Sequence, residues 1–211
     1  NSGLNAVGTK EEPILFTGEQ KAEGYWNYIQ FHNGSLVDQC KLIYAIIEYG
    51  GYRKATTLLV DNSSMQIENT IIRHCKNTGA DIQEHSFPVF KNNVVKDNDI
   101  PVKVFFNNVH CIEGGKFSGN NNDVVLIRNS HFIDSNVIWE KLDVPYRFDE
   151  KWFSIVNGSL TLDPGITLEL SDRGRINIDE NSAILAQGTE EEKITFTGIL
   201  KEPGAWDYLT F

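Results

Sequence analysis

Acidic and basic residues lie close together in one short segment, VVKDNDIPVK, which contains Lys96, Asp97, Asp99 and Lys103. A polysaccharide lyase uses such groups, because carboxylates bind Ca²⁺ while a lysine or arginine removes a proton from the sugar. A glycoside hydrolase would instead use two or three carboxylates about 5 to 10 Å apart. An ordinary solvated turn is the alternative, since Asp-Asn-Asp before Ile-Pro is typical of turns. These four residues are the catalytic candidates, and Ca²⁺ would be a cofactor only if the lyase hypothesis holds.

Two aromatic pairs, Trp26 with Tyr28 and Trp206 with Tyr208, occur in closely similar contexts near the two ends of the chain. Aromatic faces beside polar groups commonly stack on sugar rings, so these four residues are candidate glycan contacts. The alternative is that the rings pack over a corner of the fold, which their repetition at equivalent places also favours. A second aromatic group could form a further platform or pack in the same way: Trp139, Tyr146 and Trp152.

The other residue types that commonly carry chemistry show no active-site pattern. The three cysteines, Cys40, Cys75 and Cys111, have a spacing that suits neither a disulfide scaffold nor a zinc motif. We interpret them as buried free thiols. The five histidines lack metal-ligand spacing, and the sequence contains no G-x-S-x-G motif and no phosphate-binding glycine loop.

Composition excludes several classes of partner. The chain has 211 residues, enough for one domain with a sizeable core, and a net charge of −10. A nucleic acid or an anionic membrane requires a basic partner, so neither is expected. No stretch approaches the roughly 18 apolar residues of a membrane-spanning helix. The sequence begins with Asn1 and has no signal-peptide pattern, which indicates a mature or excised piece.

Short β-type segments dominate the sequence, and helical periodicity is nearly absent. Runs of four to eight residues rich in Ile, Val, Thr and Phe are separated by Asn, Gly and Asp, as in TTLLV, VKVFF, DVVLIRN and GITLEL. Such runs are typical of strands that are buried on at least one face. The sequence therefore predicts an all-β fold.

An Asn-centred motif, apolar-x-Asn-x-x-apolar, recurs at Asn69, Asn92, Asn108 and Asn129, and Tyr44 takes the same place in an earlier copy. The steps between these residues are 25, 23, 16 and 21, which predicts a β-solenoid of about 20–25 residues per turn. The step of 16 is short for a full turn. Asn tolerates left-handed backbone, and its amide can bond the equivalent amide one turn away. We interpret the column as solenoid corners, with ligand binding as the alternative.

The first thirty-one residues of the chain recur at its end. Residues 181–211 match residues 1–31 without a gap, at an offset of 180, and sixteen of the thirty-one positions are identical. Such a repeat favours an extended, repetitive architecture. A solenoid needs polar capping turns, and neither end of this sequence supplies one. We therefore expect further turns of the same polypeptide, or another copy of it, at the uncapped ends.

Two segments interrupt the strand pattern. Residues 113–123 are rich in Gly and Asn and are predicted to form a loop that protrudes between strands. Residues 140–152 are predicted to be a seam between two long repeating units. Residues 1–139 would then form the turns of a first unit, and residues 153–211 would begin a second unit of the same solenoid. The whole chain is expected to be one structural domain and a fragment of a longer protein.

Several strings in the chain resemble a known family. GSLTLDPGITLEL contains the turn Leu160–Leu168, followed by G-T-x-x-x-x-I-x-F-T-G at Gly188–Gly198 and G-x-W at Gly204–Phe211. The last two strings also stand at Gly8–Gly18 and Gly24–Phe31. They resemble right-handed parallel β-helix repeat proteins of bacterial surfaces and secretions, and the resemblance covers nearly the whole chain. It implies a right-handed parallel β-helix, an architecture that carries adhesins, scaffolds and polysaccharide-degrading enzymes.

These features lead to two functional hypotheses. The first is a non-catalytic module of a secreted or cell-surface bacterial protein that serves in adhesion, scaffolding or glycan contact. Its expected partners are a glycan or another cell-surface protein. The second is a polysaccharide lyase or glycoside hydrolase on the same fold. Release of product from a polysaccharide would favour the second hypothesis, and glycan binding without product would favour the first.

Overall fold

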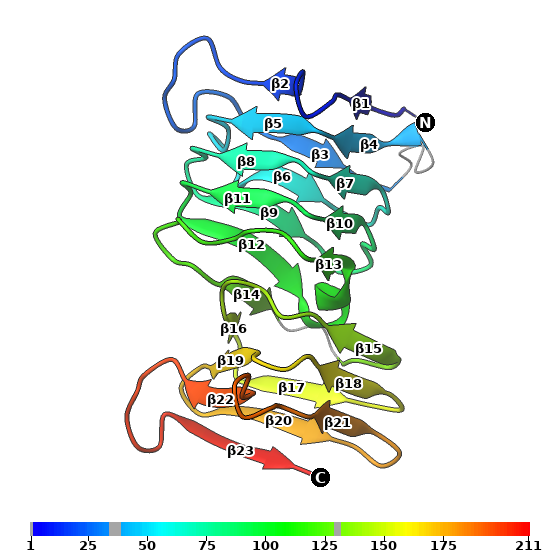
Figure 1. The fold of residues 1–211 in the computed structure, drawn as a ribbon, viewed down its shortest axis with the longest axis vertical. Helices are drawn as coiled ribbons and strands as arrows, with labels where there is room; N and C mark the ends of the chain where they lie inside the picture. The colour runs from blue at the N-terminus through cyan, green and yellow to red at the C-terminus, as the bar shows by residue number, and fades with distance from the viewer. Residues whose placement is uncertain (1, 34–38, 129–131) are drawn as a thin grey trace. The chain divides into compact units, whose positions relative to one another are not determined.

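Strands dominate the structure, a computed structural model that describes residues 2–33, 39–128 and 132–211 (Figure 1). A short 3-10 helix, η2 (Phe106–Cys111), lies among them. Contacts divide the chain into two compact units, which we describe separately. They comprise Asn1–Lys103 with Cys111–Val124, and Val104–His110 with Val125–Phe211.

The strands of the first unit form three stacks that the chain visits in a fixed order. The first stack contains β1 (Asn5–Val7), β4 (Lys41–Ile43), β7 (Gln66–Glu68), β10 (Val89–Lys91) and β13 (Ile112–Glu113). The second contains β2 (Ile14–Phe16), β5 (Ala45–Glu48), β8 (Ile71–Arg73) and β11 (Val94–Lys96). The third contains β3 (Ile29–Phe31), β6 (Thr56–Val60), β9 (Thr78–Ile82) and β12 (Ile100–Phe105). Each turn gives one strand to each stack and the strands pair in parallel, so the unit is a β-solenoid.

The length of a turn follows from the strand register. Lys41 pairs with Gln66, and Gln66 pairs with Val89 in the next turn. These inner turns confirm the expected period of about 20–25 residues per turn. The first turn is longer, because the connections from β1 to β2 (residues 8–13) and from β2 to β3 (residues 17–28) are both longer than their counterparts in the second turn.

Left-handed residues mark both ends of β5, β8 and β11 in the second stack, and the same two places in the turn after β11. One column precedes these strands, and a second column follows five positions later in each turn. The first column has φ between 49° and 57°, at Tyr44, Asn69, Asn92 and Gly114. The second has φ between 53° and 95°, at Tyr49, His74, Asp97 and Gly119. A left-handed residue turns the chain sharply, and Asn, Asp and Gly adopt it at low cost. The interpretation of Asn69 and Asn92 as corner residues is confirmed.

The side-chain hydrogen bonds of the corners come from the residue after each left-handed position. Asn93 accepts a hydrogen bond from the backbone N–H of Thr70 at 2.9 Å and donates to the carbonyl of Ile67 at 2.8 Å. Asn98 does the same at the second corner, with the N–H of Cys75 at 3.0 Å and the carbonyl of Ile72 at 3.2 Å. The amide bonding expected of the motif residues is therefore supplied by their neighbours.

Two members of the Asn motif do not join this column. Asn108 lies fully buried in η2, which explains why the step from Asn92 is too short for a turn. Asn129 lies outside the described residues.

The prediction of a protruding loop at residues 113–123 is wrong. Phe117 in this segment is fully buried, and the N–H of Lys116 donates to the carbonyl of Asn93 at 2.8 Å. Asn120 donates to the carbonyl of Val95 at 3.0 Å, just as Asn98 of the preceding turn donates to the carbonyl of Ile72. The segment therefore continues the solenoid path, because its single large apolar residue enters the core and its Asn residues serve the corners.

The second unit repeats the three-stack arrangement. One stack contains β14 (Val125–Arg128), β16 (Tyr146–Phe148), β19 (Thr167–Leu170) and β22 (Thr195–Gly198). Another contains β17 (Trp152–Ile155), β20 (Gly174–Ile178) and β23 (Trp206–Thr210). The third contains β15 (Asn136–Trp139), β18 (Ser159–Leu162) and β21 (Ala183–Ala186). Residues 140–152, the expected seam, hold β16 and the first residue of β17.

The cores of the two units differ in composition. Fully buried aliphatic residues fill much of the first, among them Leu42, Ile47, Leu58, Ile67 and Ile72. In the second, the ring of Phe106 lies 5.5 Å from that of Trp139 and 5.1 Å from that of Phe153, between ring centroids. Trp139 and Tyr146 are almost completely buried, so the idea that they form an exposed platform is wrong. Large aromatic rings have a large apolar surface, so their burial in the core is strongly favourable.

The terminal repeat corresponds to one complete turn at each place. Residues 1–31 form β1, β2 and β3, and residues 181–211 form β21, β22 and β23 in the same order. The first loop of each copy is closed alike, because the N–H of Glu12 donates to Thr9 Oγ1 and that of Glu192 to Thr189 Oγ1, both at 3.0 Å. The sequence repeat is therefore a repeat of structure.

Candidate functional site

Three long polar or aromatic side chains lie in a row on the outer face of the stack formed by β17, β20 and β23. Trp152 pairs with Arg175, and Arg175 pairs with Tyr208. Trp152 is 57% exposed and Tyr208 is 43% exposed. Neighbouring strands lie about 4.8 Å apart, so the two rings are separated by about 10 Å with the guanidinium between them. We call Trp152, Arg175, Asp207 and Tyr208 the aromatic ladder.

A β-bulge brings Asp207 into the ladder. Gly174 pairs with Trp206 but Arg175 pairs with Tyr208, so Asp207 is an extra residue in β23. As a result Arg175 reaches two partners. Its Nη2 lies 3.3 Å from Asp207 Oδ2, and its Nη1 donates to the hydroxyl of Tyr208 at 3.1 Å. The guanidinium carbon also lies 5.2 Å from the centroid of the Tyr208 ring, within the range of a cation–π contact.

A second polar row lies beside the aromatic ladder. Ser154 pairs with Asn177, and Asn177 pairs with Thr210, two positions along each strand from the ladder. Residues two apart in a strand point to the same face, and the residues between them, Phe153 and Ile176, are buried. The outer face therefore offers two aromatic rings and a guanidinium next to a hydroxyl and amide row.

This arrangement has the chemistry of a binding surface. Aromatic faces stack on the apolar C–H faces of sugar rings, while Arg, Asp and Asn side chains hydrogen-bond sugar hydroxyls. Within the described residues of the ladder there is one carboxylate, Asp207, and it is held by Arg175. Glycoside hydrolysis by a typical enzyme uses a pair of carboxylates. The ladder therefore offers groups of the kind that contact sugars, but it does not supply such a pair.

Three of the four predicted catalytic residues, Lys96, Asp97 and Asp99, lie at or beside the second corner column of the first unit. Asp97 has a φ of 56° in the second corner column, and its Oδ2 lies 3.2 Å from Lys96 Nζ. Asp99 instead accepts a hydrogen bond from Asn122 Nδ2 at 3.0 Å, and Lys103 lies on β12. The structure therefore pairs Lys96 with Asp97 and gives Asp97 a backbone role as a corner. A catalytic role for these residues stays a prediction.

The predicted aromatic contacts lie in two separate turns. Trp26 is partly buried, and its indole Nε1 donates to the carbonyl of Glu48 at 2.8 Å. Lys54 Nζ lies 5.8 Å from the centroid of the Tyr28 ring. Trp206 is half-buried on β23, whereas Tyr208 belongs to the aromatic ladder. The sequence pattern indicated Tyr208 but not Arg175, because the pairing of Arg175 depends on a bulged register with a distant strand.

Two buried carboxylates are held by basic residues from neighbouring turns. Glu48 accepts hydrogen bonds from Arg73 Nε and Thr17 Oγ1, both at 2.9 Å. Burial raises the pKa of Glu48, but these two hydrogen bonds and the charge of Arg73 outweigh it, so the pKa lies below its ordinary value. Glu169 has a similar environment, with Arg147 Nη2 at 2.7 Å and Lys201 Nζ at 3.2 Å. Both carboxylates are paired with basic side chains of neighbouring turns, which is a structural role.

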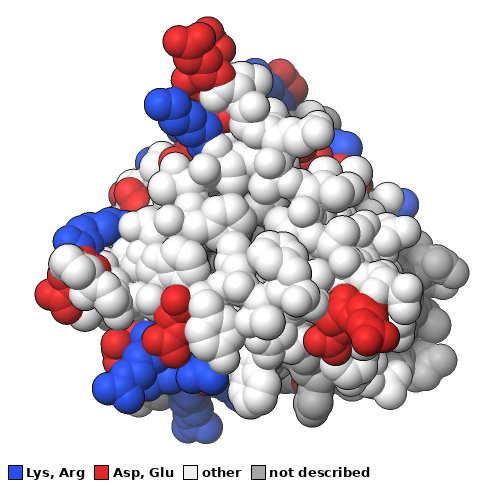
Figure 2. Space-filling view, turned by 90° about the horizontal axis from the view of Figure 1, so that it is seen from below, with Lys and Arg blue, Asp and Glu red and all other residues white. Residues whose placement is uncertain are grey.

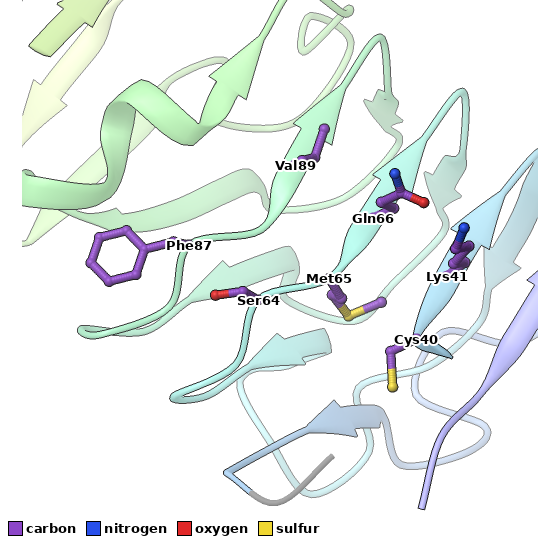
Figure 3. Close-up of a pocket in the computed structure, with 7 residues that line it drawn as sticks. All are labelled: Cys40, Lys41, Ser64, Met65, Gln66, Phe87 and Val89. Carbon is purple, nitrogen blue, oxygen red and sulfur yellow. The ribbon is translucent and has the colours of Figure 1, made fainter. Parts of the chain in front are cut away.

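A shallow hollow of about 280 Å³ lies on the first stack of the first unit (Figure 3). Lys41, Gln66 and Val89 form one row across it from three successive turns. The sulfur-bearing side chains of Cys40 and Met65 also line it, and both residues are almost fully buried. With a single charged group and no convergent polar cluster, the hollow offers less specific recognition than the aromatic ladder.

The three cysteines are free and buried, as the sequence interpretation predicted. Burial raises the pKa of Cys75 to about 11 and that of Cys111 to about 12, so both thiols stay protonated at neutral pH. In residues 2–33, 39–128 and 132–211 there is no group of three or more His, Cys, Asp or Glu side chains that could hold a metal ion. Across the same residues, no helix has the length and apolar character needed to cross a bilayer.

Comparison with protein-family models, curated proteins and solved structures gives no match to this chain. The structure supports the parallel β-solenoid and its repeated turns. The secreted, bacterial cell-surface type rests on the motif resemblance alone.

Proposed function

We propose that the chain is a non-catalytic module of a secreted or cell-surface bacterial β-solenoid protein, and that it contacts glycans through the aromatic ladder. The observation that carries this proposal is the exposed row of Trp152, Arg175 and Tyr208, two rings with a guanidinium between them. Equivalent side chains on neighbouring parallel strands recur at a constant spacing of about 5 Å. This regular spacing suits the successive sugar rings of an extended polysaccharide.

Several properties of the chain support a binding role. The parallel stacks hold the ladder residues on strands, which places them more rigidly than loops would. Arg175 is held by Asp207 and Tyr208 before any ligand arrives, so little side-chain freedom is lost on binding. The net charge of −10 favours neutral or basic glycans over strongly acidic ones, because like charges repel.

The test is binding of the purified chain to a glycan array and to a panel of neutral and acidic polysaccharides. We expect binding to at least one neutral or basic glycan without release of product. Trp152→Ala and Tyr208→Ala should each weaken that binding about tenfold, because truncation of a central aromatic contact commonly costs more than about 1 kcal/mol.

Tyr52→Ala is the matched control, since Tyr52 is 61% exposed and lies in the first unit outside the ladder. It should leave the affinity unchanged. Equal losses in Tyr52→Ala and Tyr208→Ala, or no binding to any glycan, would contradict the proposed site. Release of sugar fragments that is lost in Asp97→Asn or Asp99→Asn would instead establish the polysaccharide lyase or hydrolase alternative.

A further inference from the structure

A groove of about 410 Å³ follows the first corner column of the first unit, apart from the surfaces described above. Its floor is the outer face of three strands of the second stack, because Ile46 pairs with Ile71 and Ile71 pairs with Val94. The residues beside them in each strand are buried, so these three side chains point outwards and line the groove. The floor is therefore a row of aliphatic side chains from three successive turns.

Left-handed corner residues also line the groove, namely Tyr44, Asn69 and Asn92. Asn93 supplies the hydrogen bonds that hold the corner, so the side-chain amide of Asn92 has no part in them. Within the described residues, the side-chain amides of Asn69 and Asn92 make no hydrogen bond. Two amide groups, each able to donate and to accept, are thus left for a ligand.

A short loop of the first turn, residues 8–13, completes the lining with Thr9, Lys10 and Pro13. The loop is held on the second turn, since the N–H of Gly8 donates to the carbonyl of Ile43 at 2.9 Å. It is also closed on itself, because the N–H of Glu12 donates to Thr9 Oγ1 at 3.0 Å. The groove is therefore formed before any ligand arrives, which lowers the entropic cost of binding.

The lining differs from the ordinary outer surface of the solenoid in its charge. Viewed from the end where β23 lies, charged side chains gather towards the rim, on the outer faces of the turns (Figure 2). The groove also lies on an outer face, yet Lys10 is the single charged residue among those that line it. A concave site with an apolar floor and a few convergent polar groups is the usual form of a ligand-binding site.

The combination of aliphatic side chains and amides matches the chemistry of an acetamido group. The methyl group of an acetamide is apolar, while its C=O accepts a hydrogen bond and its N–H donates one. Plain sugar rings are usually contacted by aromatic faces, whereas this floor is aliphatic. An Asn amide donates and accepts at once, so it can bond an acetamide in both senses.

The spacing of the groove residues favours a sugar chain over other extended ligands. Equivalent positions recur about every 4.8 Å from turn to turn, and this spacing suits successive sugar rings. An extended peptide presents groups on one side only about every 6.6–6.8 Å, so its groups do not match successive turns. An acyl chain has no hydrogen-bonding groups along its length for Asn69 and Asn92.

We propose that this groove binds a polysaccharide that carries acetamido groups. The acetamide methyl groups contact Ile46, Ile71 and Val94, and the acetamide N–H and C=O groups hydrogen-bond the side chains of Asn69 and Asn92. The site goes beyond the proposed function, because it lies in the first unit and uses no residue of the aromatic ladder. The net charge of −10 favours a neutral chain over an acidic one as the source of the acetamido group.

The first experiment compares oligosaccharides that differ in the acetamido group. The isotope-labelled full chain is titrated with N-acetylchitohexaose and with cellohexaose, which has the same linkage and ring number but hydroxyl groups in place of the acetamides. The side-chain amide NMR signals of Asn69 and Asn92 should shift, with an affinity for N-acetylchitohexaose about fivefold or more above that for cellohexaose. Equal affinities, or no shift of these signals, overturn the proposal.

Two further probes test the source of the acetamido group and the class of ligand. A hyaluronan hexasaccharide, in which acetamido and carboxylate sugars alternate, represents an acidic chain. Shifts of the groove signals with either acetamido probe support the proposal, and the tighter of the two identifies a neutral or an acidic source. An N-acetylated alanine tetrapeptide amide carries methyl and amide groups at the spacing of a peptide. Comparable binding of this peptide overturns the proposal in favour of a peptide ligand.

The second experiment removes the amides and keeps the corners. Asn69→Gly and Asn92→Gly retain the left-handed backbone, so each should weaken binding of N-acetylchitohexaose about threefold or more without loss of stability. Asn62→Gly is the matched control, because Asn62 is exposed, has a φ of 48° and lies outside the groove. This control should leave the affinity unchanged. Equal losses in all three variants overturn the assignment.

The groove and the aromatic ladder can be separated in the same titration. Trp152→Ala and Tyr208→Ala should leave the shifts of Asn69 and Asn92 unchanged. If N-acetylchitohexaose shifts only signals of ladder residues, the groove proposal fails and the proposed function stands. If it shifts only signals of groove residues, the groove proposal stands and the assignment of the ladder fails.

Discussion

Individual charged residues in this protein are placed by contacts between turns. Glu48 is buried between Thr17 of the preceding turn and Arg73 of the following one, and Glu169 lies between Lys201 and Arg147 in the same manner. A buried carboxylate without such partners would be strongly destabilising. Each of these glutamates therefore fixes the register of three successive turns.

Glu48→Gln tests this role through pH. The pKa of Glu48 is lowered in the folded state from the ordinary value of 4.5, so its stabilising contribution is complete above pH 4.5 and is lost as pH falls through the folded pKa. The wild type should lose stability below pH 4.5, and Glu48→Gln should lose less in that range. At pH 7 the variant should be about 1–3 kcal/mol less stable, measured by urea denaturation.

Glu113→Gln serves as the control for this measurement. Glu113 pairs with Lys91 at 2.7 Å, but both side chains are largely exposed. Exposed ion pairs contribute roughly 0–1 kcal/mol, so this variant should keep the acid sensitivity of the wild type. Parallel pH profiles for Glu48→Gln and the wild type would contradict the assignment.

Left-handed corner residues determine where the short strands begin and end. A short strand such as β8 or β11 is bounded on both sides by one left-handed residue. The side chain that follows the left-handed residue then hydrogen-bonds the backbone of the preceding turn. Asn93, for example, accepts from the N–H of Thr70 and donates to the carbonyl of Ile67. Sequence periodicity located these corners through Asn69 and Asn92, but it assigned the hydrogen bonding to the wrong residue, because which side chain points inward depends on the stacked turn.

Substitution of Asn92 separates backbone conformation from side-chain contacts. Its φ of 53° is accessible to Gly without cost and is strained for a β-branched residue. Asn92→Gly should change the free energy of unfolding little, whereas Asn92→Val should destabilise by about 1–2 kcal/mol. Thermal or urea unfolding of both variants measures the difference.

Lys41→Val is the matched control, because Lys41 lies on an outward position of β4 where extended backbone suits a β-branched residue. It should cost less than Asn92→Val. Equal losses at the two positions would show that the left-handed corner is not the cause.

At the scale of the whole molecule, stability is distributed from turn to turn. In a solenoid each turn contacts only its neighbours, so a turn with a partner on both sides is held more strongly than one with a partner on one side. β8 pairs with both β5 and β11, while β22 pairs with β19 alone among the described strands.

Hydrogen exchange should reveal this gradient. At low protein concentration, backbone amides of β8 should exchange at least about tenfold more slowly than those of β22 and β23, because local opening of an end turn breaks fewer contacts. Mass spectrometry of peptides from the two regions measures the rates. Equal protection of β8 and β22 would contradict this dependence on the number of paired neighbours.

The sequence by itself determined the all-β class, the repeated turn, the corner Asn residues and the terminal repeat, since each is a local or strictly periodic pattern. Tertiary structure alone decided which residues meet between turns. Trp152, Arg175 and Tyr208 lie far apart in the sequence, and a bulge shifts the second pairing. It also decided that Trp139 and Tyr146 are core while Trp152 is exposed. The reason is that connections between strands vary in length, so stacking, which the local sequence does not encode, sets both register and burial.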